Sequence, residues 1–389
     1  MIRHITTLIW NQKRKHLGLS FEIFFSFMVL FGVFSLMYYN FQWFFQPLGF
    51  AYEKVWNVSL DTKNAPEAEV NAMREQISQL MESYPEIENY AFSHTNIPFG
   101  FGTNTWGLER NGVDTEADVF RITDGYVPTF EMPILAGRNF GPEDDGTETQ
   151  PILITEITRE KLFGEESAIG KTVQGRGGEP NFKVVGVVAN FRYKGSFGEV
   201  RHGFFIRTTK DRWMNQLLVK TNHKADARFE AKMLKDLSSL APNWSVDIDY
   251  FTDMQENNFL LSLLPVLIFG IISAFLIFNV SLGLFGVLWQ NISKRREEIG
   301  IRRSMGATKR GITFQFIGEI LVLSSFSVLF GVFFAVQFPL LNIFYIAAEV
   351  YLWGILAAIV AIYLLVFLCA YFPSAQAAKL HPAVALRDE

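Results

Sequence analysis

Four long, almost uncharged runs of residues decide what this chain can fold into. Only two charged side chains interrupt them, Glu22 in the first run and Glu319 in the third. About 20 apolar residues in a helix cross the hydrocarbon core of a bilayer, and each run is at least that long. Burial of four such helices in a soluble core is the weaker alternative. We therefore predict four transmembrane helices, at residues 17–39, 259–289, 312–340 and 351–371.

Basic residues beside the four runs predict how the helices are oriented. Residues 1–16, 290–311 and 372–389 carry thirteen Lys and Arg in all, whereas the short loop 341–350 carries none. Loops rich in Lys and Arg stay on the cytoplasmic side of a membrane. The first run is too long for a signal peptide and no small-residue cleavage site follows it, so we expect an uncleaved anchor. Both termini are therefore predicted to be cytoplasmic, and residues 40–258 to lie outside.

The predicted fold class is a membrane protein with four transmembrane α-helices and a large α+β extracytoplasmic domain between the first and the second. Near the N-terminus, Ile2, Ile5, Leu8 and Ile9 fall on one helical face, which predicts a helix lying on the cytoplasmic surface. The predicted segments are this interfacial helix (1–16), transmembrane helix 1 (17–39), the extracytoplasmic domain (40–258), transmembrane helix 2 (259–289), a cytoplasmic loop (290–311), transmembrane helix 3 (312–340), an outer loop (341–350), transmembrane helix 4 (351–371) and a cytoplasmic tail (372–389).

The external segment has the pattern of a folded α+β domain. Its 22 Lys and Arg against 32 Asp and Glu give a net charge of −10, which argues against a nucleic-acid partner. The only cysteine, Cys369, lies in the fourth run, so the domain must fold without a disulfide. A strand–helix–strand pattern occurs at 52–95 and again at 216–252, around a middle rich in short strands, turns and glycine.

The stretch LFGEESAIGKTVQG (162–175) ends like a phosphate-binding loop but does not fit one. Such a loop has four residues before its GKT or GKS ending, whereas Gly164 and Gly170 enclose five. Glu165 stands where the first glycine belongs, and its carboxylate would repel phosphate. The stretch also lies in the predicted external domain, away from cytoplasmic ATP. We predict a turn before a strand at 167–170 and no nucleotide site.

Catalytic and metal-binding patterns are not recognisable elsewhere in the sequence. The six histidines are scattered, and no HExxH, paired CxxC or GxSxG occurs. Acidic residues are plentiful, but nothing in the sequence separates a catalytic pair from a solvated surface. We therefore predict a non-catalytic chain that holds no metal or cofactor of its own.

The loop between the second and third runs, QNISKRREEIGIRRSMGATKRGI (290–312), carries the strongest functional signal. Good helix formers extend to Met305, Gly306 is a typical helix stop, and Thr308 is a typical cap for the next helix. Glu298 and Arg302 are four apart, in the order that favours a helical ion pair.

An apolar edge accompanies these charges. Ile292 and Ile299 are seven residues apart and would lie beside several arginines. Anchoring by positive charge is the plainer explanation of the basic residues alone. Anchoring alone does not require the acidic residues among the basic ones, the apolar edge, or the glycines at 300 and 306. We therefore expect a short helix that docks on a cytoplasmic partner, with Glu298 and Arg302 as interface groups.

This loop resembles that of the MacB/FtsX-like ABC transporter permeases. The matching positions are Arg295, Glu298, Ile299, Gly300, Arg302, Gly306 and Ala307. The tail PSAQAAKLHPAVALRDE is also similar to the family ending, at Pro373, Ala377, Ala378, Pro382, Ala385, Leu386 and Arg387, although Ser374 replaces the usual alanine. GYVPTFEMPILAGRNF and the stretch around LFGEESAIGKTV resemble the family's external domain, and the element order is similar over the whole chain.

The resemblance implies a membrane subunit that transmits motion. In the family, the loop helix seats on a cytoplasmic ABC ATPase, which binds ATP and Mg and moves the external domain of a dimer. The coupling residues implied here are Arg295, Arg296, Glu297, Glu298, Ile299, Gly300, Arg302, Arg303, Gly306 and Ala307. The implied location is a bacterial inner membrane, the implied partners are the ATPase, membrane lipid and a second permease copy or paralogue, and a periplasmic or outer-membrane partner stays open.

Long spans agree with such a role. The second and third runs hold 31 and 29 residues, or ~46 and ~44 Å as helices, against a hydrocarbon core of ~30 Å. We expect them to project beyond the bilayer as a stalk. Glu22 is expected to reach toward the cytoplasmic surface near Lys15, and Glu319 to face the interior of the helix bundle, neither as a proton relay.

Several functions stay open within and beyond this family. The leading interpretation is a MacB-type permease for export or for transmission of motion across the envelope. A lipoprotein-releasing permease like LolC and LolE is the first alternative, and an FtsX-like regulator of cell-wall hydrolases is the second. From another class, the chain could be a membrane receptor that works without an ATPase, although the loop argues against it. An enzyme is the weakest interpretation.

Overall fold

The computed structural model describes residues 13–63, 65–177, 180–208 and 213–377. Most of the predicted interfacial helix, and the tail from residue 378 onward, therefore lie outside the described residues. The chain divides into a membrane unit, residues 1–42 with 263–389, and an external unit, residues 43–262.

Four described helices are long and apolar enough to span a membrane, at 20–44, 251–286, 309–340 and 348–376. About 20 apolar residues suffice to cross the hydrocarbon core, so each of these windows is sufficient. A short α8 joins the second to the third, and α10 follows the third. The helices are α2 (Lys13–Phe44), α7 (Phe251–Ser293), α8 (Arg296–Ser304), α9 (Lys309–Ala335), α10 (Gln337–Leu340), the 3₁₀ turn η2 (Ile343–Tyr345) and α11 (Ala348–Ala377).

The predicted spans and the observed helices differ at their ends. α7 starts at Phe251, eight residues before the predicted span, because helical backbone continues directly from the last external strand. The third span is interrupted after Ala335, and α10 adds one turn that contains Pro339. α11 continues through Pro373 to Ala377, so the first residues of the predicted tail are helical.

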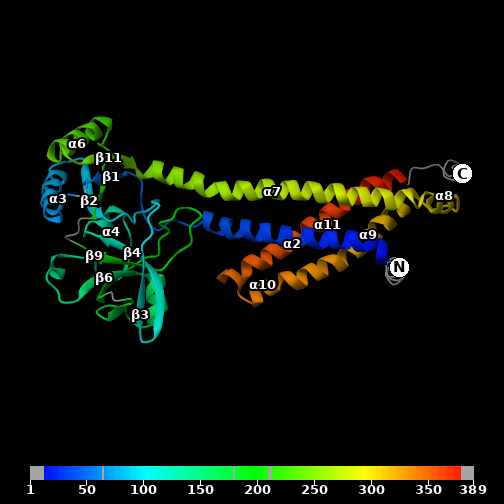
Figure 1. Ribbon diagram of the computed structural model, residues 1–389, viewed down its shortest axis with the longest axis horizontal. Helices are drawn as coiled ribbons and strands as arrows, with labels where there is room; N and C mark the ends of the chain where they lie inside the picture. The colour runs from blue at the N-terminus through cyan, green and yellow to red at the C-terminus, as the bar shows by residue number, and fades with distance from the viewer. Residues whose placement is uncertain (1–12, 64, 178–179, 209–212, 378–389) are drawn as a thin grey trace. The chain divides into compact units, whose positions relative to one another are not determined.

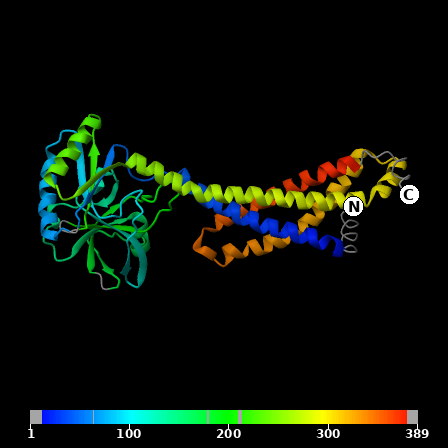
Figure 2. The same cartoon turned by 45° about the horizontal axis from the view of Figure 1, so that its top comes forward.

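Packing in the membrane unit uses glycine at close helix contacts. α9 and α11 run side by side (Figure 2). A Cβ on Gly331 of α9 would lie 2.4 Å from the Phe27 ring of α2, and one on Gly354 of α11 would lie 2.0 Å from Ser35 Oγ. Small residues let membrane helices approach closely. The apolar window of α7 is different, because only 6% of it is buried against 33% for α9 and α11.

The two predicted strand–helix–strand units interleave in one antiparallel sheet. The strand order is β11-β1-β10-β2, so each unit contributes alternate strands. This is the split β-α-β arrangement of ferredoxin-like folds. The elements are β1 (Val55–Asp61), α3 (Glu67–Glu82), β2 (Ile87–Ser93), β10 (Gln216–Thr221), α6 (Ala227–Leu240) and β11 (Ser245–Tyr250).

Helices α3 and α6 pack side by side against this sheet (Figure 1). Ile77 of α3 and Met233 of α6 are both buried in a core with Val58 of β1 and Leu217 of β10. α6 is capped by Asp226, whose Oδ1 accepts hydrogen bonds from the backbone N–H groups of Arg228 and Phe229. Such a cap satisfies donors that a helix start leaves unpaired.

An insertion of short strands fills the middle of the external unit, as the sequence predicts. It continues the sheet from β2 through one pairing of Ser93 with Ile122. Aromatic residues dominate its core, including Phe120, Phe191 and Phe205. The elements are β3 (Thr105–Arg110), β4 (Val113–Ile122), α4 (Tyr126–Thr129), β5 (Ile134–Gly137), η1 (Pro142–Asp144), β6 (Gln150–Thr155), α5 (Glu156–Phe163), β7 (Thr172–Gly175), β8 (Asn181–Val188) and β9 (Gly203–Arg207).

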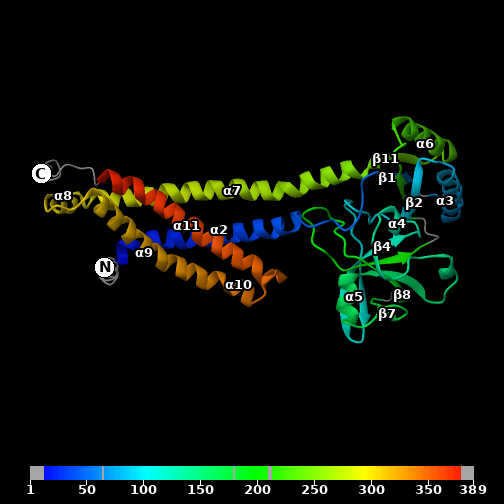
Figure 3. The same ribbon diagram turned by 180° about the vertical axis from the view of Figure 1, so that it is seen from behind.

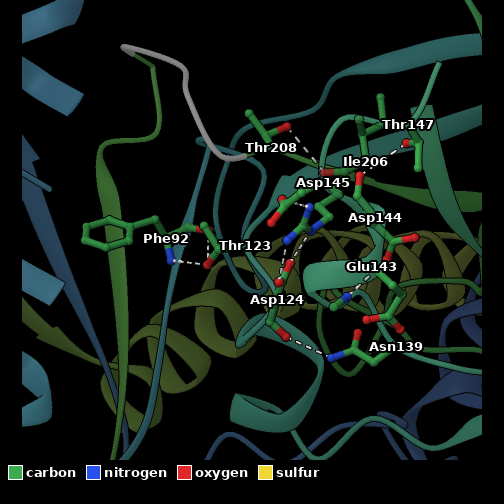
Figure 4. A network of polar contacts seen from close by, with 12 residues as sticks. Phe92, Thr123, Asp124, Asn139, Glu143, Asp144, Asp145, Thr147, Ile206 and Thr208 are labelled. Carbon is green, nitrogen blue, oxygen red and sulfur yellow. Dashed lines mark hydrogen bonds and ion pairs between the residues drawn. The ribbon is translucent and has the colours of Figure 1, made fainter. Parts of the chain in front are cut away.

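Ion pairs hold the loops at one edge of this insertion (Figure 4). Arg207 at the end of β9 donates to both oxygens of Asp124, at 2.7 and 2.9 Å, and to Asp145 at 2.6 Å. Arg138 donates to both oxygens of Asp144, each at 2.7 Å. The amide of Asn139 donates to the backbone carbonyl of Asp124 at 2.8 Å. Arginine is suited to such forked pairing with carboxylates.

Candidate functional site

α8 is a separate short helix between two long ones (Figure 3). α7 ends at Ser293, and α8 begins at Arg296. Gly306 follows α8 with a φ of +95°, a left-handed conformation that favours glycine. Thr308 then caps α9, because its Oγ1 accepts a hydrogen bond from the N–H of Gly311 at 3.1 Å. The glycine stop and the threonine cap are as predicted from the sequence.

The buried side of α8 packs onto α9. Ile299 is only 1% exposed and lies in a small cluster with Ile312 and Phe316, which Ala307 also contacts. We expected Ile299 to form an outward apolar edge with Ile292. That expectation is wrong for Ile299. Its side chain packs against Ile312 and Phe316 of α9, and this burial of apolar surface is favourable. The side chain of Ile292 lies outside the described part of the chain.

The exposed side of α8 carries two other apolar side chains. Ile301 is 49% exposed and Met305 is 74% exposed. Met305 follows the last residue of α8, and its N–H donates to the carbonyl of Ile301 at 3.0 Å, so the helical turn continues and places both side chains on one face. Lys309 and Arg310 are also exposed, at the start of α9. This surface was not predicted from the sequence, because the pair Ile292 and Ile299, seven residues apart, was considered and not Ile301 and Met305, four residues apart. We call Ile301, Met305, Lys309 and Arg310 the exposed α8 surface.

Five polar side chains form a closed ring between α8 and α9. Arg295 Nε lies 2.8 Å from Glu298 Oε2, and its Nη1 lies 2.6 Å from Glu319 Oε2. Arg302 Nη2 lies 2.5 Å from Glu298 Oε1, and its Nη1 donates to Gln315 Oε1 at 3.0 Å. Gln315 Nε2 closes the ring by donating to Glu319 Oε1 at 3.2 Å. We call these five residues the α8–α9 ring.

The ring is stabilised further by its surroundings. The Arg295 guanidinium lies over the Phe316 ring, 4.9 Å from the centroid, in cation–π geometry. Burial lowers the pKa of Arg295, but its hydrogen bonds to Glu298 and Glu319 and the charges of both carboxylates outweigh burial and raise the pKa above its usual value. Arginine therefore stays charged in this ring at every physiological pH.

Three of the predicted coupling residues make contacts within this chain. Glu298 and Arg302 pair with each other, as their spacing predicts, but also with residues of this chain rather than standing free for a partner. Arg295 connects the start of α8 to α9. All three therefore fix the position of α8. Gly300 is buried, and the side chains of Arg296, Glu297 and Arg303 lie outside the described part of the chain.

Glu319 is a ring member within the third membrane helix. It belongs to α9 and to a candidate span, and its side chain is 18% exposed. Its two oxygens are used by Arg295 and Gln315. A paired carboxylate is the usual state of an acid within a membrane helix. These contacts do not test the expectation that Glu319 faces the bundle interior, because Arg295 lies in the loop and Gln315 in α9 itself.

Two family models match this chain, one over most of the external unit with part of α2 and one over the later membrane helices. A family model described as "MacB-like periplasmic core domain" matches residues 23–235, and one described as "FtsX-like permease C-terminal" matches residues 270–382. This chain belongs to the MacB/FtsX-like ABC transporter permeases. The α8–α9 ring and the exposed α8 surface both lie within the FtsX-like match, and most of the external unit lies within the MacB-like match.

Individual relatives are distant. The uncharacterized ABC transporter permease YvrN of Bacillus subtilis (strain 168) is 27% identical over 293 residues, 70% of each chain. The macrolide export ATP-binding/permease protein MacB of Bdellovibrio bacteriovorus is 26% identical over 294 residues, 68% of this chain but 43% of that protein. The solved periplasmic region of MacB from Actinobacillus actinomycetemcomitans covers 53% of this chain and 93% of its own, at 13% identity and a TM-score of 0.39.

The GKT stretch of this MacB-like domain is built unlike a phosphate loop. Lys171 is followed by strand β7, whereas the lysine of a phosphate loop opens a helix. Its Nζ lies 2.7 Å from Glu166 Oε2, which also pairs with Arg110 at 3.0 Å. The N–H of Lys171 donates to the carbonyl of Ala168 in a turn. The predicted turn before a strand is therefore present.

Proposed function

We propose that this chain is the membrane subunit of a MacB-like ABC transporter, coupled to a separate cytoplasmic ATPase. In this proposal, the ATPase binds the exposed α8 surface, and ATP hydrolysis moves α8 together with α9. The motion reaches the external domain and drives export, efflux or transmission across the envelope. The chain itself holds no ATP, and Mg and ATP are bound by the partner.

The observation that carries this proposal is that one side of α8 is bound to a membrane helix while the other side is exposed. Its inner side is fastened to a membrane helix by the α8–α9 ring and by Ile299. Its outer side presents the exposed apolar residues Ile301 and Met305. An isolated pair of exposed apolar side chains would need no explanation. Here the helix that carries them is also fixed to α9, and a contact that transmits force requires such an attachment.

Assembly as a dimer is part of the proposal. The apolar window of α7 is 6% buried within the chain, so lipid or another protein must cover it. A second copy or a paralogue would cover part of this surface, with lipid over the rest. The exposed α8 surface would then occur twice in the complex, as a pair of ATPase subunits needs.

Affinity purification of the tagged full chain from its own cells tests the proposal. We expect an ATPase with Walker motifs to copurify, together with ATP hydrolysis that the permease alone lacks. Cross-linking within the purified complex should join the ATPase to Lys309, next to the exposed α8 surface. Purification without any ATPase, from membranes that retain the chain's activity, would contradict the proposal and favour a receptor.

A further inference from the structure

The loop between β8 and β9 reaches both helices that enter the external unit. We call residues 192–198 of this loop (RYKGSFG) the strap. The strap contacts the last residues of α2, the segment after α2 and the first turns of α7. All of these contacts fall within the external unit, residues 43–262.

Arg192 of the strap binds the end of α2. Its side chain is 2% exposed and donates to four backbone carbonyls. Nη1 donates to Trp43 at 2.6 Å and to Ser196 at 2.9 Å, and Nε donates to Pro47 at 3.2 Å. Nη2 donates to the carbonyl of Gln46. The backbone N–H of Arg192 also donates to the carbonyl of Leu48, at 2.8 Å.

These contacts meet a specific need of a helix end. The last carbonyls of an α-helix have no partner within the helix and carry a partial negative charge. A guanidinium with five N–H donors in a fixed plane can satisfy several of them at once. All four acceptors of Arg192 are backbone carbonyl oxygens. Trp43 lies in the last turn of α2, Gln46 and Pro47 follow that helix, and Ser196 belongs to the strap. The buried cation therefore joins the strap to the end of α2 and to the backbone after it.

Phe197 joins the same strap to α7. Its ring stacks on Phe44 of α2, with centroids 5.5 Å apart, and on Phe259 of α7, with centroids 5.7 Å apart. Phe44 and Phe259 also contact each other directly, at 6.0 Å. Three rings therefore connect the end of α2, the strap and the first turns of α7. Such aromatic contacts contribute beyond the burial of their area.

Two further contacts fix the strap between these helices. Gly195 has a φ of +98°, and a Cβ there would lie 2.2 Å from Asn258 Oδ1 of α7. Only glycine combines this backbone conformation with so close an approach. Lys194 donates to Thr103 Oγ1 at 2.7 Å and to the carbonyl of Gly102 at 2.8 Å. The strap is thus held from three sides.

We propose that the strap is the joint through which α2 and α7 move the external domain as one body. Arg192 clamps the end of α2, Phe197 couples α2 to α7, and β8 and β9 connect the strap to the sheet. Arg192 and Phe197 are positioning residues in this role. The proposal rests on the proposed function, since a joint of this kind matters only when the membrane helices drive the domain.

Hydrogen exchange of the full chain in nanodiscs tests the clamp without any ATPase. Arg192→Met removes every hydrogen-bond donor of the side chain. Methionine still provides an unbranched apolar side chain at this position. We expect exchange at the amides of Arg192, Gly195 and Gly198 to become at least about tenfold faster. Arg176→Met, which removes an exposed arginine from an ion pair with Asp114, is the matched control and should leave the strap unchanged. Unchanged exchange in Arg192→Met would overturn the clamp.

Movement is tested in the complex with its ATPase. Spin labels at Glu116→Cys of β4 and Leu341→Cys, both exposed positions, report the distance between the external domain and the membrane unit in a chain with Cys369→Ala. We expect wild type to show a distance change on ATP addition. Phe197→Ser, a change at a half-buried position, should keep ATP turnover within about twofold and lose that distance change, whereas Phe197→Leu should retain it.

The outcomes separate the two proposals. An equal distance change in wild type and Phe197→Ser would overturn the joint and leave the proposed function standing. No distance change in wild type would count against the proposed function, and the exchange measurement would still decide on the clamp. A thermal unfolding midpoint for Phe197→Ser close to that of Phe197→Leu would exclude misfolding as the cause of a loss.

Discussion

The guanidinium of Arg295 lies 2.6 Å from the carboxylate of Glu319, one at the start of α8 and the other within α9. This ion pair ties a short loop helix to a membrane helix. The same arginine pairs with Glu298, and the same glutamate accepts from Gln315. α8 is therefore joined to α9 by several polar contacts in addition to the turn between them.

Glu319 should act through its hydrogen bonds and not through a proton. Glu319→Gln keeps an acceptor for Arg295, so we expect it to retain most of the transport-linked activity. Glu319→Leu leaves the half-buried Arg295 with Glu298 alone, and we expect a clear loss of that activity. The measurement is a growth phenotype that depends on the transporter, at equal amounts of protein in the membrane. Equal loss in both variants would contradict this prediction.

Lys171 should have no part in nucleotide binding. Its ammonium is already paired with Glu166, in an exposed turn of the external unit. We expect Lys171→Ala to leave the ATPase rate of the assembled complex within about twofold. Loss of a true phosphate-loop lysine would abolish the rate. Saturable ATP binding by the purified chain alone would disprove this prediction.

Two exposed serines test the orientation in the membrane. Ser245 lies in β11 of the external unit, and Ser304 ends α8. In a chain with Cys369→Ala, a membrane-impermeant thiol reagent should label Ser245→Cys and not Ser304→Cys in cells with a permeable outer barrier. The reasoning is the concentration of Lys and Arg beside α8. The reverse pattern would invert the proposed topology.

The pair of Arg138 and Asp144 should make part of the external unit sensitive to acid. Hydrogen bonds and charge from Arg138, with a further bond from the N–H of Gly141, hold the pKa of Asp144 below its usual value. A depressed pKa stabilises the folded state above about pH 4, where an unfolded Asp is ionised, and this contribution is lost as the pH falls further.

Asp144→Asn tests this dependence, because asparagine resembles the protonated acid. At pH 7 we expect a local destabilisation of about 1 kcal/mol, a modest figure because Arg138 is partly solvated. Hydrogen exchange across residues 138–148 should then be faster than in wild type, and the difference should shrink as the pH approaches 3. A difference that does not depend on pH would contradict the assignment to this ion pair.

Periodicity and charge predicted the elements of this fold but not all of their arrangement. Apolar length predicted the four spans, and Gly306 and Thr308 predicted where α8 ends and α9 begins. The start of α8 at Arg296 was not predicted. The interleaving of β1, β10 and β2 depends on pairing between strands far apart in the chain, which local pattern does not specify. For the same reason, nothing in the sequence marks Arg192 as a clamp for Trp43, 149 residues earlier.

The sequence predicted an apolar edge of Ile292 and Ile299 on the loop helix, whereas the structure buries Ile299 against α9. A short helix has apolar side chains on more than one side, and the side that faces inward is decided by the neighbouring helix. Ile299 packs against Ile312 and Phe316, whereas Ile301 and Met305 are exposed. Charge reversal at Glu298 would therefore break contacts within the chain, and it does not isolate docking on a partner.

The most direct test of the account is the amount of ATPase that copurifies with Met305→Glu. Met305 is 74% exposed, so the change should leave the fold of the chain intact. An unpaired charge at a docked surface costs ~2–5 kcal/mol, and we expect copurified ATPase per permease to fall at least about tenfold. Met305→Leu and Val113→Glu, an equal charge added on the external unit, should keep wild-type amounts. Wild-type amounts in both Met305→Glu and Ile301→Glu would contradict docking of an ATPase on α8.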